Sequence, residues 1–189
     1  MPKQKITKEM VVDAAFSLAR AGGMEQVLVK NIAKALHCSV QPIYSYCSSM
    51  EGLRREVYAR VNSFVRSYVA ERTDPTDRFA ATGRAYVSLA RQEPQIYKLF
   101  ITQPRPPASS LEDVYAASAD PTMARTIAAD LGISPDEARR LHLHMLIYTI
   151  GLGTAFAASA PGIPAEEMLA QQERAYRAFL KDVMEEKQK

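Results

Sequence analysis

Apolar residues recur every three or four positions along most of the chain, which is the spacing of helices with one buried face. Turn-forming residues separate these segments, and N-cap sequences open several of them. We predict helix starts at Thr7, at the capping box Ser48-x-x-Glu51 and at Ser134-x-x-Glu137. Because no stretch alternates apolar and polar residues between turns, as a half-buried strand would, we predict an all-α fold of about nine or ten helices.

The composition agrees with this class and indicates the cellular setting. The 189 residues include 28 Ala and 8 Gly, which favours helix, and two Cys, which exclude a disulfide scaffold and suit the cytoplasm. No signal peptide is visible before the first predicted helix. The longest uncharged run has its apolar centre at 145–160, which as a helix spans about 24 Å, less than the ~30 Å core of a bilayer. We therefore predict a cytoplasmic protein in which this run is a buried helix and not a membrane span.

Residues 28–47 have the pattern of a helix-turn-helix motif. Two short apolar segments, around Ile32 and Ile43, are joined by a tight turn, and Ala33 is small enough to let the two helices cross closely. The second helix of such a motif enters the DNA major groove, and here its first residues have short or hydrogen-bonding side chains. The residues that we expect to contact DNA are Lys30, Ser39, Val40, Gln41, Pro42, Tyr44, Ser45, Tyr46, Ser48 and Ser49.

These side chains can recognise DNA in different ways, and each also has a plainer interpretation. Gln41 can pair with adenine and Val40 can meet a thymine methyl group, whereas the alternative is ordinary solvated surface. Tyr44 and Tyr46 can donate their hydroxyl hydrogens to phosphates, whereas the alternative is a pair of half-buried helix aromatics. We favour the contacts with DNA because all four residues lie inside the motif.

The stretch from Ile32 to Leu53 resembles the TetR family of bacterial transcriptional regulators. The shared pattern is Ile-Ala, a turn that ends in Ser, then Ile43-Tyr44-x-Tyr46, and a Leu after a capped helix start. The resemblance implies a DNA-binding domain at 1–55 and a helical effector-binding and dimerisation domain at 56–189. It also implies a homodimer that places one reading helix in each half-site of a near-palindromic operator.

The sequence departs from the family pattern at four places. His37 stands where the family usually has Gly, in a turn that favours a positive φ, and Cys47 stands where an aromatic residue is usual. Met50 replaces a common Lys that touches phosphate, and Leu28-Val29 replaces a common Thr cap. These last two changes favour one alternative function, a helical ligand-binding or protein-interaction module whose DNA site has decayed.

The charge distribution favours DNA binding in spite of these departures. The formal net charge is +3, but residues 1–55 contain eight basic and four acidic side chains, for a net charge of +4. The remaining residues contain 16 basic and 17 acidic side chains, for a net charge of −1. Lys30, Lys34 and Arg54 lie in the basic part and can compensate for the missing contacts.

The resemblance further implies a small, largely apolar effector in the second domain and a dimer through the last two helices. The candidate ligand-binding residues are Tyr86, Tyr97, Phe100, Met123, Ile127, His144, Met145 and Tyr148. The candidate dimerisation residues are Leu152, Phe156, Leu169, Tyr176, Phe179 and Val183. The alternative for both sets is plain helical packing within one chain.

We expect no metal site, no cofactor and no catalytic site. His142 and His144 are two residues apart and point different ways on a helix, unlike an i, i+4 chelating pair. Cys38 and Cys47 are about 13 Å apart if the chain between them is helical, which is too far for a disulfide. The sequence therefore favours a homodimeric DNA-binding regulator over an enzyme. In this family such a protein is most often a repressor that a small effector releases, and we expect the long helix at 49–72 to transmit the change.

Overall fold

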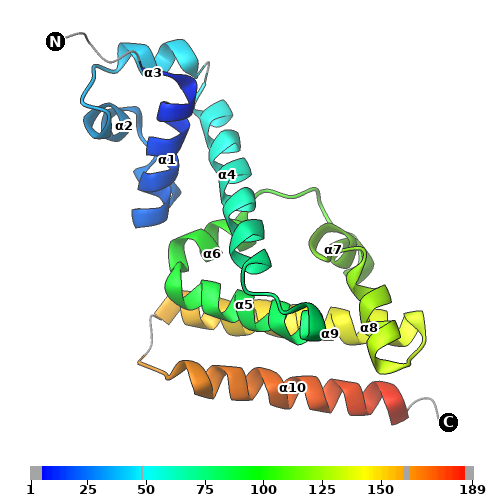
Figure 1. Ribbon diagram of the computed structural model, residues 1–189. Coiled ribbons are helices and arrows are strands. Elements are labelled where there is room, and N and C mark those ends of the chain that lie inside the picture. Colours follow the sequence, from blue (N-terminus) through cyan, green and yellow to red (C-terminus); the bar gives the residue numbers. More distant parts are fainter. Residues whose placement is uncertain (1–5, 48, 160–161, 186–189) are drawn as a thin grey trace. The chain divides into compact units, whose positions relative to one another are not determined.

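The computed structural model describes residues 6–47, 49–159 and 162–185. Within these ranges no strand occurs, and ten α-helices and two short 3₁₀ helices form the regular structure (Figure 1), which confirms the predicted all-α fold. The α-helices are α1 (Lys8–Gly22), α2 (Val29–Ala35), α3 (Gln41–Tyr46), α4 (Met50–Ala70), α5 (Arg78–Gln92), α6 (Pro94–Thr102), α7 (Leu111–Ser118), α8 (Met123–Leu131), α9 (Pro135–Ser159) and α10 (Ala165–Glu185). The 3₁₀ helices are η1 (Met24–Gln26) and η2 (Pro75–Asp77).

The chain forms two compact units that interleave in sequence. The head unit takes in Met1–Ser67 and Glu93–Gln103, and the bundle unit takes in Tyr68–Gln92 and Pro104–Lys189. The segment after α5 returns to the head unit because α6 packs against α1. This structural division differs from the functional division that we predicted after residue 55, which stays a prediction.

The head unit has a core to which each of its helices contributes. Ile6 and Thr7 open α1: Ile6 is buried, and the Thr7 hydroxyl accepts a hydrogen bond of 3.2 Å from the Met10 N–H, as predicted for a cap. The core includes Val11, Ala15, Ala19, Ile32, Ala33, Ile43, Leu53, Val57, Val61, Ile96 and Tyr97. Packing of these side chains fixes α3 against α1 and α2, and so determines which residues of α3 face outward.

His37 closes α2 with a positive φ, as the sequence predicts for this turn. It has φ 50° and is the one non-glycine residue with positive φ among the residues that the structure describes. The His37 N–H donates to the Lys34 carbonyl at 3.2 Å, and the Cys38 N–H donates to the Ala33 carbonyl at 3.0 Å. These two bonds make a Schellman motif, in which the left-handed position most often holds glycine.

The start of α4 corrects one predicted cap. The Ser49 hydroxyl accepts a hydrogen bond of 3.0 Å from the Gly52 N–H, so Ser49 caps this helix. We predicted that Ser48 would form a capping box with Glu51, and Ser48 lies outside the described residues. The two serines are adjacent, so the pattern allowed either to be the cap.

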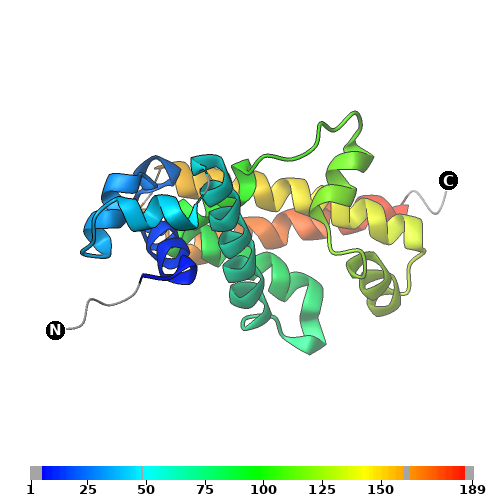
Figure 2. The same cartoon turned by 90° about the horizontal axis from the view of Figure 1, so that it is seen from above.

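In the bundle unit, α9 packs against α5, α8 and α10, and α10 lies along α9 (Figures 1 and 2). The capping box that we predicted at the start of α9 is present. The Ser134 N–H donates to Glu137 Oε2 at 2.6 Å, and the Glu137 N–H donates to Ser134 Oγ at 3.2 Å. By length and composition Pro135–Ala158 could cross a membrane. However, Leu141, Met145 and Phe156 of this helix are buried in the unit, as in the core helix that we predicted.

Candidate DNA interface and effector pocket

Helix α3 presents apolar and aromatic side chains to solvent. Ile43 is 1% exposed and anchors the helix, whereas Tyr44 is 63% exposed, Val40 41% and Tyr46 38%. Val40 is the N-cap residue of α3, and no side chain caps this helix. Pro42 lies in the first turn, where its missing N–H is tolerated. An exposed Tyr44 contradicts the half-buried alternative and leaves its hydroxyl accessible to a partner.

The other predicted DNA contacts also lie at the surface. The exposed ones are Lys30, Ser39, Gln41, Ser45 and Ser49, and Pro42 is half-buried. Two of their hydroxyls already have roles within the chain: Ser45 donates to the Gln41 carbonyl at 3.2 Å, and Ser49 caps α4. The assignment of these residues to DNA stays a prediction, and Ser48 lies outside the described residues.

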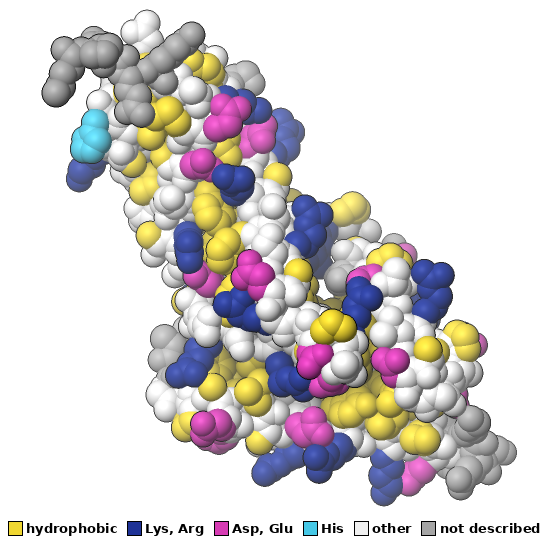
Figure 3. All heavy atoms as spheres, viewed as in Figure 1, with side chains coloured by type: hydrophobic (Ala, Val, Ile, Leu, Met, Phe, Trp, Pro, Cys, Tyr) yellow, Lys and Arg dark blue, Asp and Glu magenta, His cyan; other side chains and the backbone are white. Residues whose placement is uncertain are grey.

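The basic side chains of the head unit fall into two groups. Lys8 is paired with Glu56 at 2.6 Å, and Arg55 with Glu51 at 3.4 Å. In contrast, Lys30, Lys34 and Arg54 are exposed and form no ion pair with a described residue. These three are the residues that we expected to compensate for the missing backbone contacts. On the face shown in Figure 3, acidic and basic side chains are interspersed over the whole molecule, in keeping with the modest total charge.

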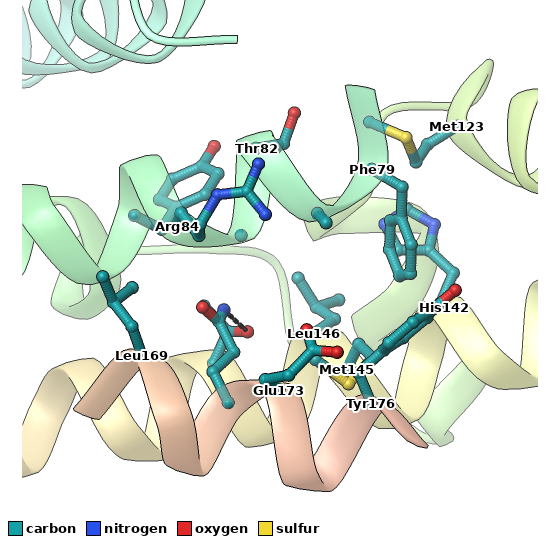
Figure 4. A pocket seen from close by; sticks show the side chains of 15 residues that line it. Phe79, Thr82, Arg84, Met123, His142, Met145, Leu146, Leu169, Glu173 and Tyr176 are labelled. Atoms are coloured by element: carbon teal, nitrogen blue, oxygen red, sulfur yellow. Dashed lines mark hydrogen bonds between the residues drawn. The ribbon is translucent and has the colours of Figure 1, made fainter. Parts of the chain in front are cut away.

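The bundle unit contains a cavity of about 100 Å³ between α5, α8, α9 and α10 (Figure 4). Its apolar walls are formed by Phe79, Met123, Met145, Leu146 and Leu169. Polar side chains that line it are Thr82, Tyr86, His142, Thr149, Gln172 and Tyr176, with Arg84 and Glu173 as the charged ones. An apolar cavity with a few polar groups is typical of a ligand site.

Three of the eight predicted effector residues line this cavity, namely Tyr86, Met123 and Met145. Tyr97 and Phe100 lie on α6, which belongs to the head unit, and Ile127 is a buried core residue of the bundle unit. Helical periodicity shows which face of a helix is apolar but not which helix covers it. These three residues do not line this cavity, and their contact with an effector stays a prediction.

His144 and Tyr148 do not line the cavity either. Both pack against the Phe179 ring, with centroid distances of 5.1 Å and 6.2 Å. His144 Nδ1 is buried and has no hydrogen-bond partner among the described residues. The two side chains therefore lie where α9 meets α10, and not in the cavity.

The predicted dimerisation residues face inward more than we expected. Phe156 is 4% exposed and Val183 1%, so both are core residues of one chain, which corrects their assignment to an interface. Leu169 and Tyr176 line the cavity, and Phe179 packs on the core beside it. Leu152 is half-buried. Packing within one chain, the alternative that we kept open, accounts for most of the six.

Most polar residues inside the cavity were not among the predicted effector residues. Gln172 is 5% exposed, and its Nε2 donates a hydrogen bond of 3.0 Å to Thr149 Oγ1 (dashed line in Figure 4). The signal was available, because Gln172 follows Met168 and precedes Tyr176 at helical spacing, on the stripe that packs inward. A polar residue on such a stripe needs a polar partner.

His142 is a further polar residue that lines the cavity and was not predicted to do so. Its Nδ1 lies 2.8 Å from the Tyr115 hydroxyl, and its ring packs edge-on against Phe79. Burial lowers the pKa of His142 to about 4, although Asp120 opposes this effect. The imidazole is therefore neutral at pH 7. Burial likewise raises the pKa of the Tyr86 phenol, so that hydroxyl keeps its proton.

Comparisons with known proteins identify the fold. No family model and no curated protein matches the sequence. A transcriptional regulator from Rhodococcus sp. Rha1 matches with a TM-score of 0.60 and 16% identity, over 94% of this chain and 97% of that one. The fatty acid degradation regulator FadR from Bacillus halodurans matches with a TM-score of 0.55 and 16% identity, over 92% and 98%. The chain has the fold of these transcriptional regulators, as the resemblance to the TetR family predicted.

Proposed function

We propose that the chain is a cytoplasmic DNA-binding transcriptional regulator of the TetR type, and not an enzyme. In this proposal α3 enters the major groove, two copies of the chain bind two half-sites, and a small molecule in the cavity of the bundle unit changes DNA affinity. The regulator acts as a repressor that the effector releases. Effector and operator favour different states of the protein, so each weakens the binding of the other to the same degree.

The surface of α3 is the observation that carries this proposal. The head unit buries Ile43 yet leaves the large apolar side chains of Tyr44 on the same helix and of the N-cap residue Val40 in solvent. Four of the eight large apolar residues exposed in the described part of the chain fall within 28–47. Exposed apolar groups that cluster on one short motif are typical of a binding surface. The unpaired Lys30, Lys34 and Arg54 supply the charge that a phosphate backbone attracts.

The test is binding of the full chain to DNA from upstream of its own gene, measured by fluorescence anisotropy across salt concentrations. We expect nanomolar-scale affinity, a steep loss of affinity with salt, and weaker binding to scrambled DNA. Gln41→Ala should reduce the preference for the specific sequence about tenfold, because it removes a base contact. Tyr44→Phe should weaken binding to both DNAs alike, because it removes a phosphate contact.

Gln171→Ala is the matched control, since Gln171 is an exposed residue of α10 in the bundle unit. It should leave binding to both DNAs unchanged. The alternative, a ligand-binding or interaction module with a decayed DNA site, is motivated by Met50 and Val29. It predicts equal, weak binding to specific and scrambled DNA, and that result would overturn the proposal.

A further inference from the structure

The size of the cavity in the bundle unit limits what it can bind. Its volume is about 100 Å³. A buried apolar cavity of about 150 Å³ takes one benzene molecule, and pockets for drug-sized ligands measure about 300–1,000 Å³. The volume of the cavity therefore suits a molecule of about one six-membered ring.

Among the polar side chains that line the cavity, the Gln172 amide is held in a specific position by its neighbours. Among the described residues the Gln172 amide makes one hydrogen bond, to Thr149, and this leaves its carbonyl oxygen and a second N–H for a ligand. Gly83 on α5 provides the space for this amide, because a Cβ at that position would lie 2.7 Å from Gln172 Nε2. The pair Gly83 and Gln172 thus places a buried donor and acceptor against apolar walls.

The charged side chains at the cavity already have partners. Arg84 Nη2 lies 2.7 Å from Asp77, and Glu173 accepts a hydrogen bond of 2.9 Å from Arg177 Nε. His142 is neutral for the reason given above. A charged ligand would therefore have to displace an existing partner of Arg84 or Glu173 to gain a counter-charge, and burial of an unpaired charge is strongly unfavourable.

From this geometry we propose that the cavity binds a small uncharged molecule, mostly apolar, with one hydrogen-bonding group that the Gln172 amide recognises. Simple phenols and short alcohols have this chemistry. The role of this molecule as the effector rests on the proposed function. Binding itself depends on the bundle unit alone.

The test compares four probes on the unmodified full chain by isothermal titration calorimetry without DNA. Phenol should bind at a single site per chain, and toluene, which lacks the hydroxyl, more weakly. Benzoate should bind at least tenfold more weakly than phenol, because it adds a charge at similar size. 4-Hexylphenol should gain less than tenfold over phenol, because the added chain exceeds the cavity. No phenol binding at millimolar concentration, equal binding of benzoate, or a larger gain from the hexyl chain would overturn the proposal.

A pair of variants tests the role of the amide. Gln172→Leu should weaken phenol binding at least tenfold and leave toluene binding unchanged within threefold, whereas Gln171→Leu should change neither. Equal weakening of phenol and toluene binding would show that the Gln172 amide does not recognise the hydroxyl group of the ligand. If Gln172→Leu does not fold, Leu146→Trp fills the cavity instead and should abolish binding of both probes; unchanged binding in that variant would overturn the site.

The DNA titration separates this inference from the proposed function. If specific DNA binding is present and phenol does not bind, the inference alone fails. If phenol binds with the expected selectivity and specific DNA binding is absent, the proposed function fails and the ligand site remains.

Discussion

Arg20 on α1 and Glu93 at the start of α6 form a two-pronged ion pair in the head unit. Arg20 Nε donates to Glu93 Oε2 at 2.8 Å, and Arg20 Nη2 pairs with Glu93 Oε1. The guanidinium also lies over the Phe64 ring of α4, 5.0 Å from its centroid. Arg20 therefore joins three helices of the head unit, and Glu93 is the residue next to the end of the cavity-lining α5.

This pair should stabilise the head unit more than an ordinary surface pair. The Glu93 side chain is only 17% exposed, and bidentate Arg–carboxylate geometry is the favourable kind. We expect a coupling free energy of about 1 kcal/mol from a double-mutant cycle with Arg20→Ala and Glu93→Ala, followed by urea unfolding. The pair Glu51–Arg55, with side chains 81% and 74% exposed, should give less than about 0.5 kcal/mol in the same cycle. Equal coupling free energies in the two cycles would contradict the claim that the Arg20–Glu93 pair is stronger than an ordinary surface pair.

His37→Gly should stabilise the head unit by about 1 kcal/mol. The backbone at His37 has φ 50°, a conformation that costs most residues with a Cβ about 1–2 kcal/mol and costs glycine little. The side chain is exposed, so few contacts are lost. Urea unfolding measures the change, and His37→Ala should not reproduce it.

Gly132 allows the opposite substitution, from glycine to a residue with a Cβ, at another position of positive φ. It ends α8 with φ 62°, and a Cβ there would meet no atom within 4 Å. Gly132→Ala should therefore destabilise the bundle unit by about 1 kcal/mol through backbone strain alone. A stabilising Gly132→Ala would contradict the strain argument at both sites.

The sequence predicted local features better than contacts between helices. The Thr7 cap, the Ser134–Glu137 box and the positive φ at His37 were all correct, because each depends on residues that are adjacent in the chain. Ser49 caps α4, one residue after the Ser48 that we predicted, and Ser48 lies outside the described residues. Local signals such as these also made the number and type of the elements predictable.

The cavity could not be predicted in the same way. Tyr97 lies on an apolar helix face like that of Met145, but α6 packs into the head unit and α9 into the bundle unit. Which of two apolar faces meets a given helix depends on the whole packing arrangement. For the same reason Tyr176, expected at a dimer interface, lines the cavity instead.

Stability should fall in mild acid because of His142. Its pKa is about 4 in the folded state against about 6.5 in the unfolded state, so the unfolded chain binds an additional proton between these values. The free energy of unfolding should therefore drop as the pH falls from about 6.5 to about 4, by up to about 3 kcal/mol from this group.

His142→Gln should remove most of this pH dependence. Urea unfolding at pH 7.5, 6.5, 5.5 and 4.5 measures the slope for the unmodified chain and the variant. Gln171→Ala, at an exposed residue that does not titrate, supplies the control and should leave the slope unchanged. If His142→Gln keeps the full slope, another group causes the acid sensitivity.

The proposed function requires a dimer. The side of α9 that faces solvent carries Ile147, 45% exposed, followed at helical spacing by the exposed Gly151, Thr154 and Ala158. This strip is uncharged and its later residues are small, so a second helix can approach closely and bury Ile147. The face fits a partner copy better than Phe156 and Val183 do, because their side chains are buried within one chain.

Ile147→Lys should therefore raise the dimer dissociation constant at least tenfold, since the symmetric interface receives the charge twice. Sedimentation velocity across a concentration series measures this shift, and DNA affinity should fall with it. Leu111→Lys on α7, where Leu111 is 61% exposed, introduces the same charge elsewhere and should leave the dimer intact. A dimer that tolerates Ile147→Lys would place the interface on another face, and an unmodified chain that stays monomeric at about 50 µM would contradict the homodimer itself.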